Sequence, residues 1–351
     1  MMQKLIHGGD VYSFQPKADF SANINPLGVP GGVLAAVQAC GKELANYPDP
    51  LCRALKKAVA EKEQVKEELL IFGNGAAELI FSLVWALRPK KAVLMAPGFA
   101  EYEQALTGAG CEISWYELAE EQGFVPEKRY FDLLTEDVDM AFVCCPNNPT
   151  GICPDPSFLK KTLELCEQHH IFLVVDECFI EFLDEPESCS MKSYLADSEN
   201  LFVLKAFTKL YAMPGLRLGY GLCKNAGVLE QMNRVMQPWS VSIPAQKAGV
   251  AALKEETYVK KARALIKTER ERLYKGLLSL GLKAWYPAAN FVFFKGPKGL
   301  DEKIRQEGFL IRDCSNYRGL DKTHYRIAVK SPEANEKLLE VLRKVLTEFY
   351  S

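Results

Sequence analysis

Short apolar runs alternate with longer segments of helical periodicity between about residues 52 and 222. Five of these runs are bounded by Gly, Pro or Asp and have the length of buried strands: 69–72, 92–95, 141–144, 172–175 and 201–204. Between two of them, Asp155 and Pro156 have the residue types of a helix start, and apolar residues then recur on one face of segment 158–166. Strands that alternate with helices in this way predict a mostly parallel sheet with helices on both faces.

The pattern changes after residue 240. It predicts a long charged helix over 255–280, strands near 290–294 and 325–329, and a closing helix from Pro332. The first 45 residues predict loops and one helix, which we expect to pack against this C-terminal part. We therefore expect a large α/β domain at 46–254 and a smaller, discontinuous α+β domain made of 1–45 and 255–351.

Composition narrows the range of partners. A chain of 351 residues is long enough for two domains, and 43 basic against 45 acidic residues predict neither a nucleic-acid partner nor a membrane partner. The longest apolar runs fall short of the ~20 residues that cross a bilayer, and no signal peptide is visible, so we expect a cytoplasmic protein. The eleven cysteines form no C-x-x-C pair and the four histidines are not grouped with them, which predicts reduced thiols and no metal site.

Lys209 follows the predicted strand at 201–204, and Arg217 comes eight residues later in a glycine-bounded segment. A lysine in apolar surroundings has a lowered pKa and can form an imine with an aldehyde. The same pattern also fits a surface lysine and a structural arginine in a hairpin.

Two polar residues follow neighbouring strands. Asn148 lies in a Pro-Asn-Asn-Pro segment after the strand at 141–144, and Asp176 ends the strand at 172–175. Ligands bind where parallel strands end on one edge of a sheet. There, Asp176 can pair with a protonated pyridine nitrogen, and the amide of Asn148 can donate to a phenolate oxygen. A turn at Asn148 and a helix cap at Asp176 are the structural alternatives.

A glycine turn leads from the first strand into a helix at Gly73-Asn74-Gly75-Ala76-Ala77. The backbone N–H groups and the positive end of such a helix are suited to bind a phosphate.

Four pieces, namely the glycine turn, the segment of Asn148, the strand end at Asp176 and the segment from Lys209 to Arg217, occur in the order and spacing of the fold-type I pyridoxal-phosphate enzymes. The chain resembles these enzymes. The resemblance implies an α/β fold of the fold-type I PLP-dependent transferases, with a large domain around a mostly parallel seven-stranded sheet and a smaller α+β domain. It implies pyridoxal 5′-phosphate (PLP) as cofactor, with Lys209 as the covalent link, Asp176 as the partner of the pyridine nitrogen and Asn148 as a donor to O3′. It also assigns the cofactor phosphate to Gly75, Ala76, Ala77 and Arg217, and ring stacking to Phe99. Tyr47 matches a tyrosine that reaches the cofactor phosphate of the partner subunit, which implies a homodimer with shared active sites.

Two positions depart from the pattern of many members. Phe179 stands where a tyrosine usually donates to O3′, and Ala206 stands where a serine usually binds the phosphate. Thr208 is the candidate replacement for that serine.

Segments spread over the chain (7–9, 19–28, 97–102, 236–241 and 310–320) are similar to the L-threonine-O-3-phosphate decarboxylases of cobalamin biosynthesis. This similarity implies decarboxylation of a phosphorylated amino acid, L-threonine O-3-phosphate, to (R)-1-amino-2-propanol O-2-phosphate. By the same similarity, the substrate-binding residues are His7, Asn23, Asn148, Arg312 and Arg326. The structural alternatives are a mobile N-terminal residue for His7 and a turn former for Asn23. Both arginines fall in apolar strand-like segments, where a buried arginine usually pairs with a carboxylate or phosphate.

Two alternatives remain open at this point. Histidinol-phosphate aminotransferases share the fold and many of the cofactor residues. A non-catalytic PLP-binding homologue is the alternative from a different functional class, and the changes at Phe179 and Ala206 keep it open.

Overall fold

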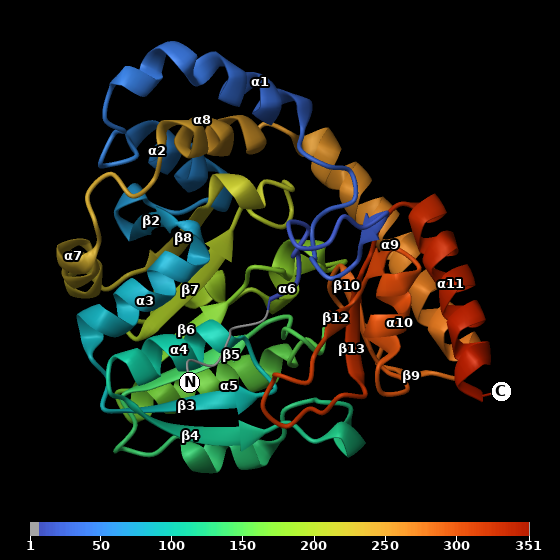
Figure 1. Cartoon of the computed structure of the whole chain (residues 1–351). Helices are drawn as coiled ribbons and strands as arrows, with labels where there is room; N and C mark the ends of the chain where they lie inside the picture. The colour runs from blue at the N-terminus through green and yellow to red at the C-terminus, as the bar shows by residue number, and fades with distance from the viewer. Residues whose placement is uncertain (1–6, 351) are drawn as a thin grey trace.

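The computed structural model describes residues 7–350. Figure 1 shows a larger part built around a twisted sheet and a smaller part, formed mostly by the C-terminal residues, in which helices lie beside a second sheet. The strands of the larger sheet are β2 (Leu70–Asn74), β3 (Lys91–Ala96), β4 (Glu112–Glu117), β5 (Met140–Cys144), β6 (Phe172–Asp176), β7 (Leu201–Ala206) and β8 (Leu218–Cys223). They lie in the order β2-β8-β7-β6-β5-β3-β4. β8 runs antiparallel to both of its neighbours and the other pairs are parallel, which confirms the expected mostly parallel seven-stranded sheet.

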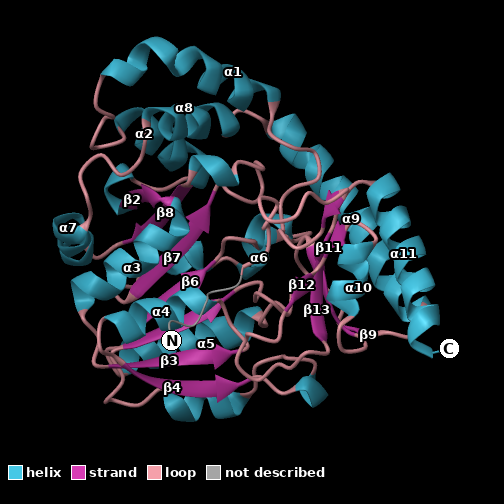
Figure 2. Cartoon of the chain, in the orientation of Figure 1, coloured by secondary structure: helices cyan, strands magenta, loops and turns pink. Residues whose placement is uncertain are grey.

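Helices cover both faces of this sheet (Figure 2). The helices of the larger part are α2 (Arg53–Glu63), α3 (Gly75–Leu87), α4 (Ala100–Gly108), α5 (Pro156–Gln168), α6 (Pro186–Cys189), α7 (Ala226–Val235) and α8 (Ile243–Ala252). Apolar residues of α3, α4 and α7 pack with one set of alternate strand residues, such as Phe142, and those of α5 with the other set, such as Val143. The predicted helix start is confirmed, because the Asp155 side chain accepts a hydrogen bond from the Ser157 N–H at 2.8 Å.

The smaller part combines an antiparallel sheet with three helices. Its strands are β9 (Lys283–Ala284), β10 (Phe291–Lys295), β12 (Arg312–Asp313) and β13 (His324–Ala328), in the order β12-β13-β10-β9. Its helices are α9 (Glu256–Ser279), α10 (Leu300–Gln306) and α11 (Pro332–Tyr350). The helix expected over 255–280 is thus observed within one residue at each end.

The N-terminal segment contacts both parts. Its short strand β1 (Ala18–Asp19) pairs in parallel with β11 (Phe309–Leu310) of the smaller part. Helix α1 (Gly31–Ala39) packs against α8 of the larger part. Short 3-10 helices complete the structure: η1 (Cys40–Ala45), η2 (Glu67–Leu69), η3 (Glu120–Gln122), η4 (Lys128–Leu133), η5 (Ile180–Phe182), η6 (Met191–Tyr194) and η7 (Pro214–Leu216). Within residues 7–350, no helix is both long and apolar enough to cross a membrane.

The five strands expected in the larger part correspond to β2, β3, β5, β6 and β7. The sequence pattern did not indicate β8, because its two glycines interrupt the apolar run. One of them, Gly219, is required by a close approach, since a Cβ atom there would lie 2.4 Å from the Ala76 backbone nitrogen. β4 was also missed, because it forms the edge of the sheet and most of its residues are only partly buried.

Candidate active site

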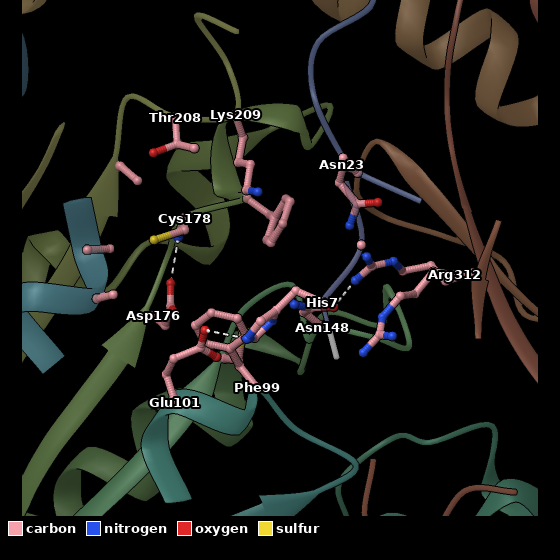
Figure 3. Close-up of a pocket in the computed structure, with 18 of the residues that line it drawn as sticks. His7, Asn23, Phe99, Glu101, Asn148, Asp176, Cys178, Thr208, Lys209 and Arg312 are labelled. Atoms are coloured by element: carbon pink, nitrogen blue, oxygen red, sulfur yellow. Dashed lines mark hydrogen bonds and ion pairs between the residues drawn. The ribbon is translucent and has the colours of Figure 1, made fainter. Parts of the chain in front are cut away.

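One edge of the large sheet gathers the chain segments that the sequence singled out. The parallel strands β2, β3, β5, β6 and β7 all end at this edge, and the antiparallel β8 begins there. A cavity of about 320 Å³ lies at the edge and is closed on its other side by residues of β12, β13 and the N-terminal segment. The predicted site residues that line it are His7, Asn23, Ala76, Ala77, Phe99, Asn148, Asp176, Thr208, Lys209, Arg217, Arg312 and Arg326. Figure 3 shows how these side chains converge from segments far apart in the sequence.

Lys209 enters the cavity from the loop after β7. Burial, together with the nearby positive charges of Arg326 and Arg217, lowers the pKa of its ammonium group to about 8. Its Nζ lies 5.8 Å from the centre of the Phe179 ring, so position 179 presents an apolar ring to this amine. At pH 7 about a tenth of Lys209 is therefore an unprotonated amine, the form that attacks an aldehyde, and this fraction is far larger than for a lysine with an ordinary pKa.

Asp176 is buried at the end of β6 and has two donors. Its Oδ1 accepts the backbone N–H of Cys178 at 2.9 Å, and its Oδ2 accepts the hydroxyl of Tyr102 at 2.5 Å. Tyr102 itself is buried, and its ring stacks on Phe142. These contacts hold the Asp176 carboxylate in one orientation beneath the cavity.

Tyr102 is a site residue that the sequence analysis did not assign. It follows Phe99 by three residues, and α4 begins directly after Phe99, so both rings lie at the start of one helix. The rings contact each other edge to face at 5.6 Å between their centres. The spacing within Pro97-Gly98-Phe99-Ala100-Glu101-Tyr102 was the signal that could have identified it.

The end of the cavity next to the start of α3 is suited to an anion. Ala76 and Ala77 form the first turn of α3, whose backbone N–H groups have no helical partners. Gly75 lies just outside the cavity and allows Arg217 to approach, because a Cβ atom at Gly75 would lie 2.4 Å from Arg217 Nη2. Its φ of 77° also favours glycine. Ala206 lines this region without a hydroxyl, while the Thr208 side chain is available nearby.

Asn148 is tied to the smaller part of the molecule. Its Oδ1 accepts a hydrogen bond from Arg326 Nη1, and Arg326 Nη2 donates to the Ser21 carbonyl at 3.0 Å. Because Arg326 engages the oxygen, the group that Asn148 can offer a ligand is its Nδ2 donor.

Arg312 and Arg326 lie opposite each other in the antiparallel pairing of β12 with β13. Both side chains are buried. Arg312 Nη2 donates to Asn316 Oδ1 at 2.7 Å, and its guanidinium lies over the Tyr317 ring at 5.5 Å. Asn23 is buried beside them, and its Oδ1 accepts no hydrogen bond from the described residues. This end of the cavity thus holds two buried positive groups side by side.

Two further residues complete the cavity wall. His7 is half-buried, and its Nε2 lies 3.6 Å from Glu101 Oε1. Burial and the charges of Arg312, Arg326 and Lys209 lower the pKa of His7. Burial raises the pKa of Glu101 to about 7. Glu101 was not assigned a role from the sequence, although it lies in the same segment as Phe99.

Tyr47 lies outside the cavity of its own chain. Its side chain is 77% exposed, and its ring stacks on Trp239 with 4.5 Å between the ring centres.

The fold and this cavity define a class of enzymes. The family model for class I and II aminotransferases matches residues 15–342, so the chain belongs to this family, whose members depend on PLP.

The chain is also similar to individual proteins over most of its length. The chain is 38% identical to the threonine-phosphate decarboxylase of Salmonella typhimurium over 94% of its own length and 91% of that protein. It is 31% identical to a bifunctional protein of adenosylcobalamin biosynthesis from Leptospira interrogans, over 97% of this chain and 41% of that longer protein. Among solved structures, the histidinol-phosphate aminotransferase of Clostridium acetobutylicum superposes with a TM-score of 0.89 at 31% identity, covering 94% of this chain and 99% of that one.

The residues present fit PLP. The cavity combines an amine of lowered pKa at Lys209, a buried carboxylate at Asp176 and a helix N-terminus beside Arg217. Gly75 leaves the space through which the Arg217 guanidinium reaches that terminus. An aldehyde, a pyridine nitrogen and a phosphate would each meet a complementary group.

Proposed function

We propose that the protein is a PLP-dependent carboxy-lyase that converts L-threonine O-3-phosphate to (R)-1-amino-2-propanol O-2-phosphate, the linker of the nucleotide loop in cobalamin. The observation that carries this proposal is the pair of buried arginines, Arg312 and Arg326, in the cavity that also holds Lys209. Two arginines on one wall are suited to a substrate with more than one negative charge. The similarity to the decarboxylase of Salmonella typhimurium supports the choice of reaction.

The cofactor residues have separate roles in this proposal. When bound, PLP supplies an electron sink for the bonds at the substrate Cα. Lys209 binds its aldehyde, and Asp176, held by Tyr102, stabilises a proton on the pyridine nitrogen. Gly75, Ala76, Ala77, Arg217 and Thr208 hold the phosphate, Phe99 stacks on the ring, and Asn148 donates to O3′.

The substrate residues select the bond that breaks. The carboxylate that leaves as CO2 must stand out of the plane of the cofactor ring, and a phosphate held at the far end of the substrate can impose that rotation. His7, Asn23 and Arg312, with Arg326 beside them, are the residues we assign to this phosphate. Lys209, whose pKa is about 8, can return a proton to Cα from its ammonium form after CO2 has left.

Amino transfer is the second candidate reaction. The close structural similarity to the histidinol-phosphate aminotransferase favours it. The cofactor residues alone do not distinguish an aminotransferase from a decarboxylase. A non-catalytic PLP-binding role is disfavoured, because Lys209, Asp176 and Arg217 all line one cavity.

The proposal includes a cytoplasmic homodimer with two composite sites. The exposed Tyr47 lies in a loop and does not line its own cavity, so it is available to reach the cofactor phosphate of a second subunit.

A direct assay tests the reaction. The holoenzyme is incubated with O-phospho-L-threonine or O-phospho-L-serine, with and without 2-oxoglutarate, and CO2 is measured. We expect CO2 from the phosphorylated amino acid without any need for the keto acid. Turnover that requires the keto acid and releases no CO2 would favour the aminotransferase.

A further inference from the structure

Glu101 is a carboxyl group in the cavity wall for which the proposed reaction has no use. It lies in the first turn of α4, and its Oε2 is buried without a hydrogen-bond partner among the described residues. Its other oxygen, Oε1, lies 3.6 Å from His7 Nε2. Figure 3 shows the two side chains directed toward each other, joined by a dashed line.

The surroundings of His7 oppose a positive charge on its ring. Partial burial lowers the pKa of the imidazole most, and the like charges of Arg312 on β12, Arg326 on β13 and Lys209 after β7 lower it further. Glu101 is the carboxyl group that approaches the ring among the described residues. A neutral imidazole would contribute only one hydrogen bond to a phosphate, whereas an imidazolium would contribute a charge as well.

The surroundings of Glu101 also come from several elements. Lys209 and Arg217 stabilise its carboxylate, Asp176 on β6 destabilises it, and burial disfavours the charge most strongly. The group therefore changes its charge in the neutral range, with a pKa of about 7. Above about pH 7 the Glu101 carboxyl is negatively charged, and in this same pH range the His7 ring is neutral unless a nearby negative charge stabilises its protonated form.

We propose that Glu101 is a positioning residue that acts through His7: its carboxylate holds the imidazole toward the two arginines and lets the ring bind a phosphate dianion as an imidazolium. When the dianion binds, His7 Nε2 gains one proton, from the Glu101 carboxyl where that group is protonated and otherwise from solvent. This inference rests on the proposed function for the location of the phosphate, and it adds a coupling between two cavity residues that are far apart in the sequence.

The test follows the protonation of His7 directly. The chain has four histidines, so ring-labelled histidine gives a small set of NMR signals, and His7→Gln identifies the signal of His7. The holoenzyme, saturated with PLP, is titrated with pH in the absence and presence of inorganic phosphate. We expect phosphate to raise the pKa of His7 by about one unit or more, because it adds negative charge beside the ring.

Glu101→Gln keeps the shape of the side chain and removes its charge. We expect this variant to lower the pKa of His7 in the phosphate-bound enzyme by about one unit, and to weaken phosphate binding roughly tenfold at pH 8. The two enzymes should converge below about pH 6, where the carboxyl of the wild-type enzyme is itself protonated. Glu103→Gln, an exposed change on the same helix, is the matched control and should alter neither quantity.

A double variant separates coupling from general damage. In a His7→Gln background, Glu101→Gln should have little further effect on phosphate binding, because its partner is gone. Unchanged signals of His169, His170 and His324 report that the variants are folded. An equal loss of affinity in both backgrounds, or a His7 titration that is the same in wild type and Glu101→Gln, would overturn the inference. If the coupling fails but the enzyme releases CO2 from O-phospho-L-threonine, the proposed function stands and only this inference is lost. If the coupling is observed but no CO2 is released, Glu101 still acts through His7 and the proposed function is lost.

Discussion

Arg312 on β12 and Arg326 on β13 are direct cross-strand partners, and both guanidinium groups reach the cavity that holds Lys209. Side chains at directly opposed positions point to the same face of a sheet and lie close together. Two like charges placed in this way repel each other, so the wall is stabilised when an anion binds between them. The antiparallel pairing of two strands of the smaller part thus shapes the end of the cavity that faces away from the large sheet.

We expect Arg312→Ala to lower kcat/KM for O-phospho-L-threonine by about 30-fold or more, corresponding to ~2 kcal/mol, the size of a hydrogen bond to a charged group. The loss for free L-threonine, itself a very poor substrate, should be much smaller because that molecule lacks the phosphate. Steady-state CO2 release with both substrates measures this. Arg318→Ala, an exposed change outside the cavity, is the control. An equal loss for the two substrates would remove Arg312 from the phosphate site.

Two nearby lysines should differ in reactivity toward PLP. Lys209 has a pKa of about 8, whereas Glu63 raises the pKa of the buried Lys205. Borohydride reduction followed by peptide mapping should find the cofactor on Lys209 and not on Lys205. When PLP is added to the apo-protein, the rate of link formation should rise about tenfold per pH unit below pH 8 and level off above it, as the amine loses its proton.

Lys209→Ala provides the control for this prediction. The variant should lose both the reducible link and turnover, yet still bind PLP through contacts to its phosphate and ring. Turnover at the wild-type rate would contradict the assigned mechanism.

We expect Tyr102→Phe to lower kcat by roughly tenfold, because Asp176 loses a hydrogen bond that is worth ~1.5 kcal/mol or more when the acceptor is charged. Asp176→Asn should keep the covalent link to PLP and lose most activity, since a neutral side chain stabilises a protonated pyridine nitrogen poorly. Tyr116→Phe is the control, because that hydroxyl accepts the Glu127 N–H away from the cavity. Wild-type activity in Tyr102→Phe would show that the contact has no role in the reaction.

The composite site can be tested by mixing subunits. If Tyr47 completes the site of its partner, a mixture of Tyr47→Phe and Lys209→Ala subunits should recover activity, because half of the sites in a mixed dimer then carry both wild-type residues. Native mass spectrometry verifies that mixed dimers have formed. Mixed dimers without recovered activity would place Tyr47 outside the shared site.

The sequence pattern predicted the central strands well for a physical reason. β5, β6 and β7 are buried on both faces, so they appear as continuous apolar runs. β8 is equally buried, but Gly219 there serves the close approach of α3 and breaks the run. The division into domains at residues 46 and 255 remains a prediction, since residues of the first 45 contact both parts of the molecule.

The candidate site was predictable where residues follow strand ends and less so elsewhere. Asp176 ends a parallel strand, and Asn148 and Lys209 follow parallel strands within four residues, so the shared edge of the sheet brings them together. Glu101 and Tyr102 lie in the first turn of a helix, two and three residues after Phe99, and this spacing marks the segment without showing which partner each side chain meets. Their roles emerge from contacts with Asp176 and His7, which are distant in the chain.

The fate of the substrate carboxylate tests the central claim most directly. The holoenzyme is given O-phospho-L-threonine labelled with 13C in the carboxyl group, and in a parallel reaction histidinol phosphate with 2-oxoglutarate. The account predicts stoichiometric 13CO2 and 1-amino-2-propanol O-2-phosphate in the first reaction, and little glutamate in the second. Efficient formation of glutamate from histidinol phosphate, with no CO2 from the phosphorylated amino acid, would contradict it and identify an aminotransferase.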